Sequence, residues 1–118
     1  SIMAYDEWLA ERVSKILREK SVHFLDKKMM GGLCFMVDDK MCVGIVKNRL
    51  MARIGPEAYE AALEKEGVSE MDFTGRAMKG YVFIQPEAVD KEEALTYWVD
   101  QCLSFNPLAK SSKKKKKK

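Results

Sequence analysis

The residues best suited to chemistry lie in a polar segment within residues 71–84, MDFTGRAMKGYVFI, which runs into an apolar stretch. Glycines bracket the polar part, and the cations Arg76 and Lys79 lie within it. Glycines let a loop turn sharply and leave its amides open, and cations beside open amides bind anions or acidic groups. We therefore expect Arg76 and Lys79, with Thr74 and Gly75, to form an anion- or partner-binding loop.

Three further cations, Lys27, Lys28 and Arg53, belong to the same hypothesis. Arg53 lies among apolar residues on an expected strand, where a charged group needs a partner of its own. A structural alternative is that Arg76 pairs with Asp72 or a neighbouring carboxylate while the glycines simply make a turn.

No residue pattern points to catalysis. His23 is the single histidine, and no cysteine or carboxylate lies at the spacing that a zinc site needs. No nucleophile motif accompanies it either. We therefore expect no catalytic residue, no metal and no cofactor, and a protein that is not an enzyme.

The cysteines indicate a reducing compartment. Cys34, Cys42 and Cys102 are an odd number without CxxC spacing, which is typical of free thiols in cytoplasmic proteins. The hairpin pattern predicts that Cys34 and Cys42 point to opposite faces of the sheet and do not meet. We expect both to act as small core residues.

Composition indicates one folded domain. The 118 residues are 47% hydrophobic and 33% charged, which excludes wholesale disorder. No apolar stretch reaches the length of a membrane helix, and the first residues lack the pattern of a secretory signal. These features predict a soluble cytoplasmic protein.

Charge is divided between the two parts of the chain. The formal net charge is +3, and removing the seven lysines at 110 and 113–118 leaves −4 on residues 1–109. We expect residues 1–109 to fold and residues 110–118 to form a disordered lysine-rich tail. A run of ammonium groups attracts nucleic acid without reading its sequence, so the tail is a candidate nucleic-acid element. The lysines of this candidate element are Lys113, Lys114, Lys115, Lys116, Lys117 and Lys118.

Periodicity predicts an α+β fold. Apolar residues at helical spacing indicate helices over residues 6–19, 56–66 and 90–106, the first capped by Asp6 and the last opened by a capping box of Asp90 and Glu93. Short extended runs at 23–29, 33–38, 41–46 and 50–54 predict an antiparallel meander, and 81–84 adds a later strand. We expect a curved antiparallel sheet flanked by N-terminal, middle and C-terminal helices.

Both faces of this sheet are expected to be apolar. Turns centred on residues 39–40 and 48–49 place one set of side chains on the core face: Cys34, Met36, Met41, Val43, Ile45, Leu50, Ala52 and Ile54. The second face then carries Leu33, Phe35, Val37, Cys42, Val46, Met51 and Arg53. Because that face is too apolar for water, we expect a homodimer or another protein partner on it, or alternatively the last helix across it.

Three strings, KKMMGGLCFMVDDKMCVGIV, RIGPEAYEAAL and MDFTGRAMKGYVFI, occur in an order and spacing that resembles the N-terminal domain of the TfoX/Sxy family of bacterial competence regulators. The resemblance covers residues 3–107, with Met30 in place of the family's usual phenylalanine and Ala77 in place of a frequent proline. It implies a curved antiparallel sheet flanked by helices and a regulatory role in transcription of DNA-uptake genes. It also implies a stand-alone domain here, without the family's C-terminal domain.

Residues and resemblance together favour a non-enzymatic regulatory module that binds protein, with a homodimer as one form of that binding. The alternative is a nucleic-acid-associated protein that uses its polylysine tail, with the folded domain as a platform.

Overall fold

Six strands form one antiparallel sheet in the order β1-β2-β3-β4-β6-β5 in the computed structural model, which describes residues 5–29, 31–73 and 75–110 and, for Phe73 and Arg76, the backbone alone. The predicted α+β class is confirmed. The strands are β1 (Leu25–Met29), β2 (Gly32–Val37), β3 (Lys40–Val46), β4 (Arg49–Arg53), β5 (Val68–Phe73) and β6 (Arg76–Ile84). The helices are α1 (Glu7–Glu19), α2 (Pro56–Leu63) and α3 (Glu92–Phe105), with short 3-10 turns η1 (Pro86–Val89) and η2 (Asn106–Leu108).

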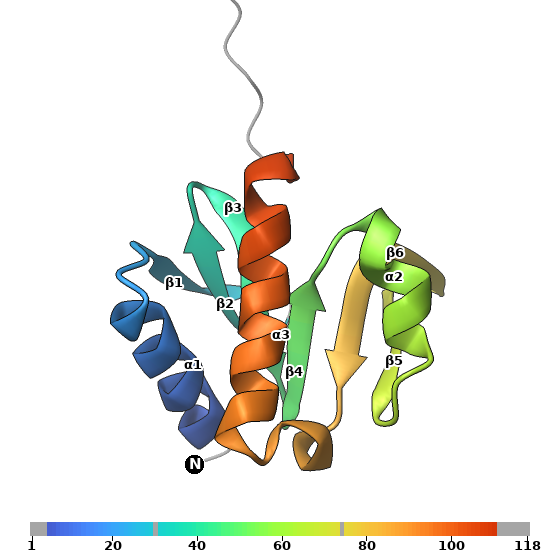
Figure 1. The fold of residues 1–118 in the computed structure, drawn as a ribbon, viewed down its shortest axis with the longest axis horizontal. Coiled ribbons are helices and arrows are strands. Elements are labelled where there is room, and N and C mark those ends of the chain that lie inside the picture. Colours follow the sequence, from blue (N-terminus) through green and yellow to red (C-terminus); the bar gives the residue numbers. More distant parts are fainter. Residues whose placement is uncertain (1–4, 30, 74, 111–118) are drawn as a thin grey trace, which may run out of the picture.

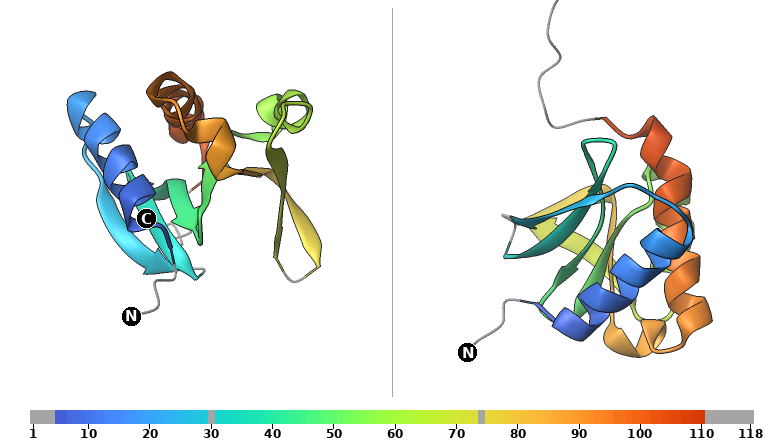
Figure 2. Two further views of the ribbon diagram at one scale, coloured as in Figure 1. Left: turned by 90° about the horizontal axis from the view of Figure 1, so that it is seen from below. Right: turned by 90° about the vertical axis from the view of Figure 1, so that its left-hand side faces the viewer.

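All three helices lie on one face of the sheet (Figures 1 and 2). In Figure 1, α3 crosses the middle of the sheet between α1 and α2. The main core forms between these helices and the sheet, and it contains side chains from each of the three helices. The alternative in which the last helix crosses the second face is therefore wrong. None of the described helices has the length and apolar character needed to cross a membrane.

The segment expected to be a polar loop is a β-hairpin. Strand β5 ends at Phe73 and β6 begins at Arg76, and Gly75 in the turn between them has a positive φ of 76°. Thr74 lies outside the described residues. The loop prediction was wrong because the first part of β6 extends past the end of β4 and pairs only with edge strand β5, and a two-stranded part at the edge of a sheet tolerates polar side chains that look like loop residues in the sequence.

The expected side-chain faces were wrong for β2. The tight turn is centred on Asp38 and Asp39, both with positive φ, rather than on residues 39–40. The β2–β3 ladder then pairs Met36 with Met41 but Phe35 with Val43, so that Cys42 is an extra residue in β3.

As a result, Leu33 and Phe35 face the helices with Val43, whereas Cys34 and Met36 face the other side. At the start of β3 the expected faces were wrong as well, because Cys42 packs in the main core and Met41 lies on the opposite face. The grouping of the remaining core residues, Val43, Ile45, Leu50, Ala52 and Ile54, is confirmed. A register change of one residue moves every following side chain of a strand to the opposite face. The position of the turn and the extra residue in β3 therefore decided which side chains of β2 lie on each face.

The predicted N-cap residue is correct for α1 but not for α3. The Asp6 carboxylate accepts hydrogen bonds from the amides of Trp8 at 2.9 Å and Leu9 at 3.1 Å, so the predicted cap is confirmed. Asp90 instead has helical backbone angles at the end of η1, and Lys91 is the extended residue before α3 without a side-chain cap. The capping-box prediction was therefore wrong, because an N-cap residue needs an extended backbone.

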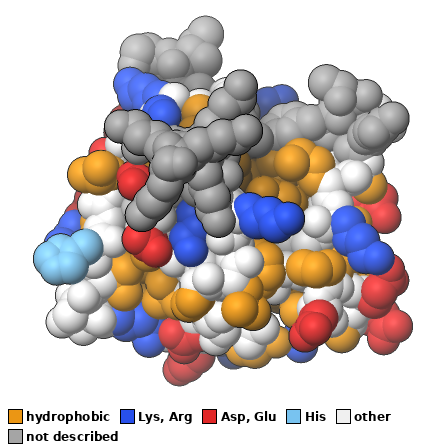
Figure 3. All heavy atoms as spheres, turned by 90° about the horizontal axis from the view of Figure 1, so that it is seen from above, with side chains coloured by type: hydrophobic (Ala, Val, Ile, Leu, Met, Phe, Trp, Pro, Cys, Tyr) orange, Lys and Arg blue, Asp and Glu red, His pale blue; other side chains and the backbone are white. Residues whose placement is uncertain are grey.

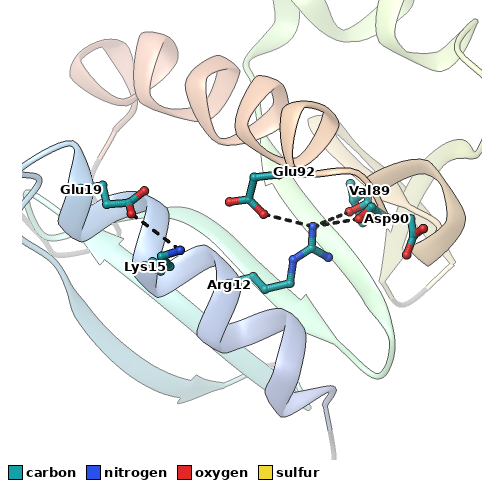
Figure 4. A network of polar contacts seen from close by, with 6 residues as sticks. All are labelled: Arg12, Lys15, Glu19, Val89, Asp90 and Glu92. Carbon is teal, nitrogen blue, oxygen red and sulfur yellow. Dashed lines mark hydrogen bonds and ion pairs between the residues drawn. The ribbon is translucent and has the colours of Figure 1, made fainter.

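Arg12 joins α1 to the start of α3 (Figure 4). One of its guanidinium nitrogens donates to the carbonyl oxygens of Val89 at 3.0 Å and Asp90 at 3.2 Å and lies 3.6 Å from a carboxylate oxygen of Glu92. The carbonyl oxygens at the end of η1 thus gain a charged donor from a residue 77 positions away.

Replacing Arg12 by methionine is expected to destabilise the fold by about 1–3 kcal/mol, because charge-assisted bonds to two carbonyl groups are lost while the apolar stem is retained. Urea denaturation measures this change. Lys15→Met on the same helix is the matched control, because Lys15 is exposed and pairs only with Glu19, and its cost should stay below about 0.5 kcal/mol. Equal costs for both variants would show that Arg12 does not act as a link.

Candidate functional site: a basic recess and a methionine-rich face

A recess lies at the end of the molecule where α3 finishes. It has a volume of about 340 Å³ and is formed where the end of β4, the start of α2, the middle of β6 and the end of α3 with the residues after it meet. Its lining residues are Arg53, Gly55, Pro56, Lys79, Gly80, Tyr81, Phe105, Leu108 and Lys110. Figure 3 looks onto this end and shows basic side chains among hydrophobic ones.

Two glycines make the floor of the recess possible. The amides of Ile54 and Gly55 both donate to the carbonyl oxygen of Gly80, at 2.9 and 3.0 Å, which joins the end of β4 to a bend in β6. Gly55 has φ 89° and ψ 163°, a region that only glycine adopts readily. A Cβ at Gly55 would also lie 2.3 Å from the ring of Phe105. The close packing of α3 on this junction therefore requires glycine.

Arg53 is the most firmly held cation of the recess. Its guanidinium donates to the carbonyl oxygens of Met41 at 3.3 Å and Lys110 at 3.2 Å. It also lies 5.2 Å from the centre of the Tyr81 ring and 5.8 Å from that of Phe105, within the range of cation–π attraction. These contacts are the partners that an arginine among apolar residues was predicted to need.

The recess is positive without a neutralising carboxylate. Arg53, Lys79 and Lys110 line it, and no lining residue is acidic. Among the described residues, none of these three cations takes part in an ion pair with an aspartate or glutamate. The lysine side chains are exposed at the rim, and Arg53 is half-buried.

The structure brings together only part of the predicted set. Arg53 and Lys79 meet in the recess, although they lie on different strands. Lys27 and Lys28 lie on edge strand β1, with side chains on opposite faces, and neither lines the recess. Gly75 lies in the exposed hairpin turn.

Several predicted positions cannot be placed. Thr74, the side chain of Arg76, and Lys113 to Lys118 lie outside the described residues, so the pairing of Arg76 with Asp72 stays a prediction. Sequence reasoning assigned Lys110 to the tail and missed it as a recess residue. The apolar pair Leu108 and Ala109 just before it, after a proline, was the available signal that the chain still follows the surface there.

A second surface is defined by methionines on the sheet face opposite the helices. All six methionines with described side chains belong to one cluster there: Met29, Met36, Met41, Met51, Met71 and Met78. The cluster is completed by Cys34, Val46, Phe83 and Tyr81, and Arg49 lies 3.8 Å above the Phe83 ring. We call this surface the methionine face.

The methionine face is buried at its centre and open at its margin. Met51, Met71 and Cys34 are fully buried within the single chain, whereas Met36 and Met41 at the margin are only partly buried. The sheet bends so that β1–β2 and β5–β6 both extend to this side (Figure 2, left). The curvature lets residues of one face pack against one another without a covering helix.

The cysteines are poorly suited to nucleophilic chemistry. All three are buried free thiols, and Cys34 and Cys42 belong to different clusters, so the prediction that they do not meet is confirmed. Burial raises the pKa of the Cys34 thiol to about 11. Burial, and then the neighbouring Cys42, raise the pKa of the Cys102 thiol well above its usual value. Thiols that keep their protons are weak nucleophiles. No group of His, Cys, Asp and Glu among the described residues has the arrangement of a metal site.

The raised pKa of Cys34 predicts a loss of stability in alkaline solution. Near neutral pH the thiol is protonated in both states, but as pH rises from about 9 to 11 the unfolded chain releases this proton and the folded chain retains it. The contribution to folding should fall by about 2 kcal/mol over this window. Urea denaturation of the protein and of Cys34→Ala at pH 8 and pH 10.5 tests this, because the variant should lose less stability. Parallel losses would contradict a buried, protonated Cys34.

Gly55→Ala is expected to destabilise the protein by about 2–4 kcal/mol, because it combines backbone strain with overlap against Phe105. Gly75→Ala is the matched control: Gly75 also has positive φ, but nothing lies within 4 Å of a Cβ there, so only about 1 kcal/mol of backbone strain is expected. Thermal unfolding of both variants measures the difference. If Gly55→Ala is no worse than Gly75→Ala, Phe105 does not pack on this junction.

One comparison with known proteins gives a match. The family described as the TfoX N-terminal domain matches residues 20–106, which is well over half of the chain. The matched range begins after α1 and includes the whole sheet, α2 and all of α3. No curated protein and no solved structure matches the chain.

Proposed function

Because the chain belongs to the TfoX N-terminal domain family, which is generally regulatory rather than catalytic, we propose that it is a non-enzymatic regulatory domain that acts by binding a protein partner through the methionine face. The observation that carries this proposal is the gathering of all six described methionine side chains on the sheet face that no helix covers. Unbranched, polarizable methionine side chains adapt to the shape of a partner and are common on protein-binding surfaces. In the cell, we propose that this binding regulates the transcription of competence genes.

The margin of the face supplies the accessible contact area. Met36 is paired across the ladder with Leu25, and directly paired residues share a face, so Leu25, which is 73% exposed, extends the surface beyond the partly buried methionines. Exposed apolar area next to adaptable side chains is typical of an interaction site.

The charges on this face favour an acidic partner. Lys27 pairs with Cys34 across β1 and β2 and therefore points to the methionine face, where it is exposed. The guanidinium of Arg49 lies over Phe83 on the same face. A partner segment with apolar residues and carboxylates complements both properties, and we propose an acidic amphipathic segment of another protein as the occupant.

A second copy of the chain fits this surface less well. The central residues of the face are already buried within one chain, so their burial does not require a dimer. A copy would also present the same cations, without carboxylates from this face to pair them. The homodimer remains a distinct outcome of the test.

Methyl NMR of protein labelled at methionine tests the proposal, because every described methionine reports on this one face. The probe is a synthetic helical peptide with leucines at positions i, i+3, i+4 and i+7 and glutamates elsewhere. We expect it to shift the resonances of Met29, Met36, Met41 and Met78, while the same peptide with lysines in place of glutamates does not.

Met36→Glu should weaken binding of the acidic peptide by about tenfold or more, because it places a carboxylate against the carboxylates of the peptide. Met36→Leu keeps an apolar side chain and should bind normally. Trp8→Glu is the matched surface control, since Trp8 is a large exposed apolar residue on α1, away from this face. Equal binding by Met36→Glu and Trp8→Glu would overturn the proposal. Light scattering that finds a dimer which Met36→Glu dissociates would assign the face to a second copy instead.

A further inference from the structure

We propose that the basic recess at the end of α3 is a binding site for a small organic anion, one with a phosphate or carboxylate head and an apolar body. This goes beyond the proposed protein-binding role, which uses another surface.

The charge of the recess is unusual for this protein. Residues 1–109 carry a net charge of −4, yet three cations from separate parts of the sequence, Arg53, Lys79 and Lys110, converge here. No carboxylate lines the recess, although acidic side chains are frequent elsewhere on the surface. Uncompensated cations in a concave site focus a positive potential and attract an anion.

Arg53 is arranged to recognise such an anion. Two hydrogen bonds to backbone carbonyls and two aromatic rings hold its guanidinium in one orientation. A guanidinium has five N–H donors, so two bonds to carbonyls leave further donors available to an oxyanion in the recess. A donor that is already held in place loses little conformational entropy on binding, which favours affinity.

A second recess continues the first on its apolar side. It has a volume of about 280 Å³ and shares Pro56, Phe105 and Leu108 with the basic recess. Its remaining wall includes Ile54 and Ala58, with Glu57, Gln101 and Ser104 as polar members. Leu108 is 75% exposed at the boundary between the two recesses, where an apolar ligand would cover it.

The cations of the basic recess and the apolar wall of the second recess together determine the ligand class. Small-molecule sites are concave, mostly apolar and carry a few well-placed polar groups, and the two recesses together have these properties. Inorganic phosphate would use only the basic part. An anion with a hydrocarbon chain or ring would place its head between the cations and its body against Phe105 and Leu108.

Calorimetric titration of the full chain tests the proposal with four probes: hexyl phosphate, hexanoate, inorganic phosphate and hexylammonium. Hexyl phosphate or hexanoate should bind at least about tenfold more tightly than inorganic phosphate, because only they cover apolar surface, and hexylammonium should not bind. The relative affinities of hexyl phosphate and hexanoate decide which head group the recess prefers.

Variants locate the binding. Lys79→Gln should weaken the better six-carbon anion about tenfold, since a charge-assisted contact is lost. Leu108→Ser should weaken that ligand but leave inorganic phosphate unchanged. Lys28→Gln is the matched control, because Lys28 is an exposed lysine on β1 that lies outside the recess and, paired with Leu33, points away from the methionine face. Lys79, Leu108 and Lys28 are all exposed, so the three variants should fold, and thermal unfolding checks this.

The proposal is overturned if Lys79→Gln and Lys28→Gln reduce affinity equally, or if inorganic phosphate binds as tightly as the six-carbon anions. Octathymidylate is a further probe. If the protein binds it more tightly than the six-carbon anions, and Leu108→Ser leaves that affinity unchanged, the cations bind nucleic acid instead. Neither result bears on the methionine face, because none of the variants used to test that face lines the recess.

Discussion

The architecture of this domain depends on one extra residue in β3. Because Cys42 has no partner of its own in the β2–β3 ladder, Phe35 pairs with Val43 and both side chains point to the helices. With a regular ladder, Phe35 would pair with Cys42, and Val43 would lie on the face opposite to Phe35. This irregularity therefore decides which side chains of β2 share the helix-covered face with Val43 and Ile45.

In the described part of the chain all three helices lie on one face of the sheet, and none of them covers the second cluster on the other face. Bending of the sheet solves much of this problem, since β1–β2 and β5–β6 both extend toward the uncovered side (Figure 2). Methionine suits a strongly curved surface, because its flexible chain fills irregular space that branched residues leave empty. The same property makes the margin of that face adaptable to a partner.

The basic recess and the methionine face meet at Tyr81. This residue lines the recess, belongs to the methionine cluster and lies beneath the guanidinium of Arg53, which it opposes across β4 and β6. A ligand that moved Arg53 would therefore act on a side chain of the methionine face. Gly55 and Gly80 make this proximity possible, because they allow the end of β4, the start of α2 and the end of α3 to approach one another closely.

Local sequence patterns were enough to predict the fold class, most element positions and the cap at Asp6, because these depend on periodicity and on interactions between near neighbours in the chain. The family followed from the resemblance of three sequence strings, which the match over residues 20–106 confirms. The sequence also identified Arg53 and Lys79 as residues of interest. Tertiary packing placed these two in one recess with Lys110, left Lys27 and Lys28 outside it, and made residues 71–80 part of a hairpin. It likewise decided which side chains of β2 meet the helices. The physical reason is that register and convergence depend on backbone angles at a few turns, and on packing between segments far apart in the chain, neither of which local composition encodes.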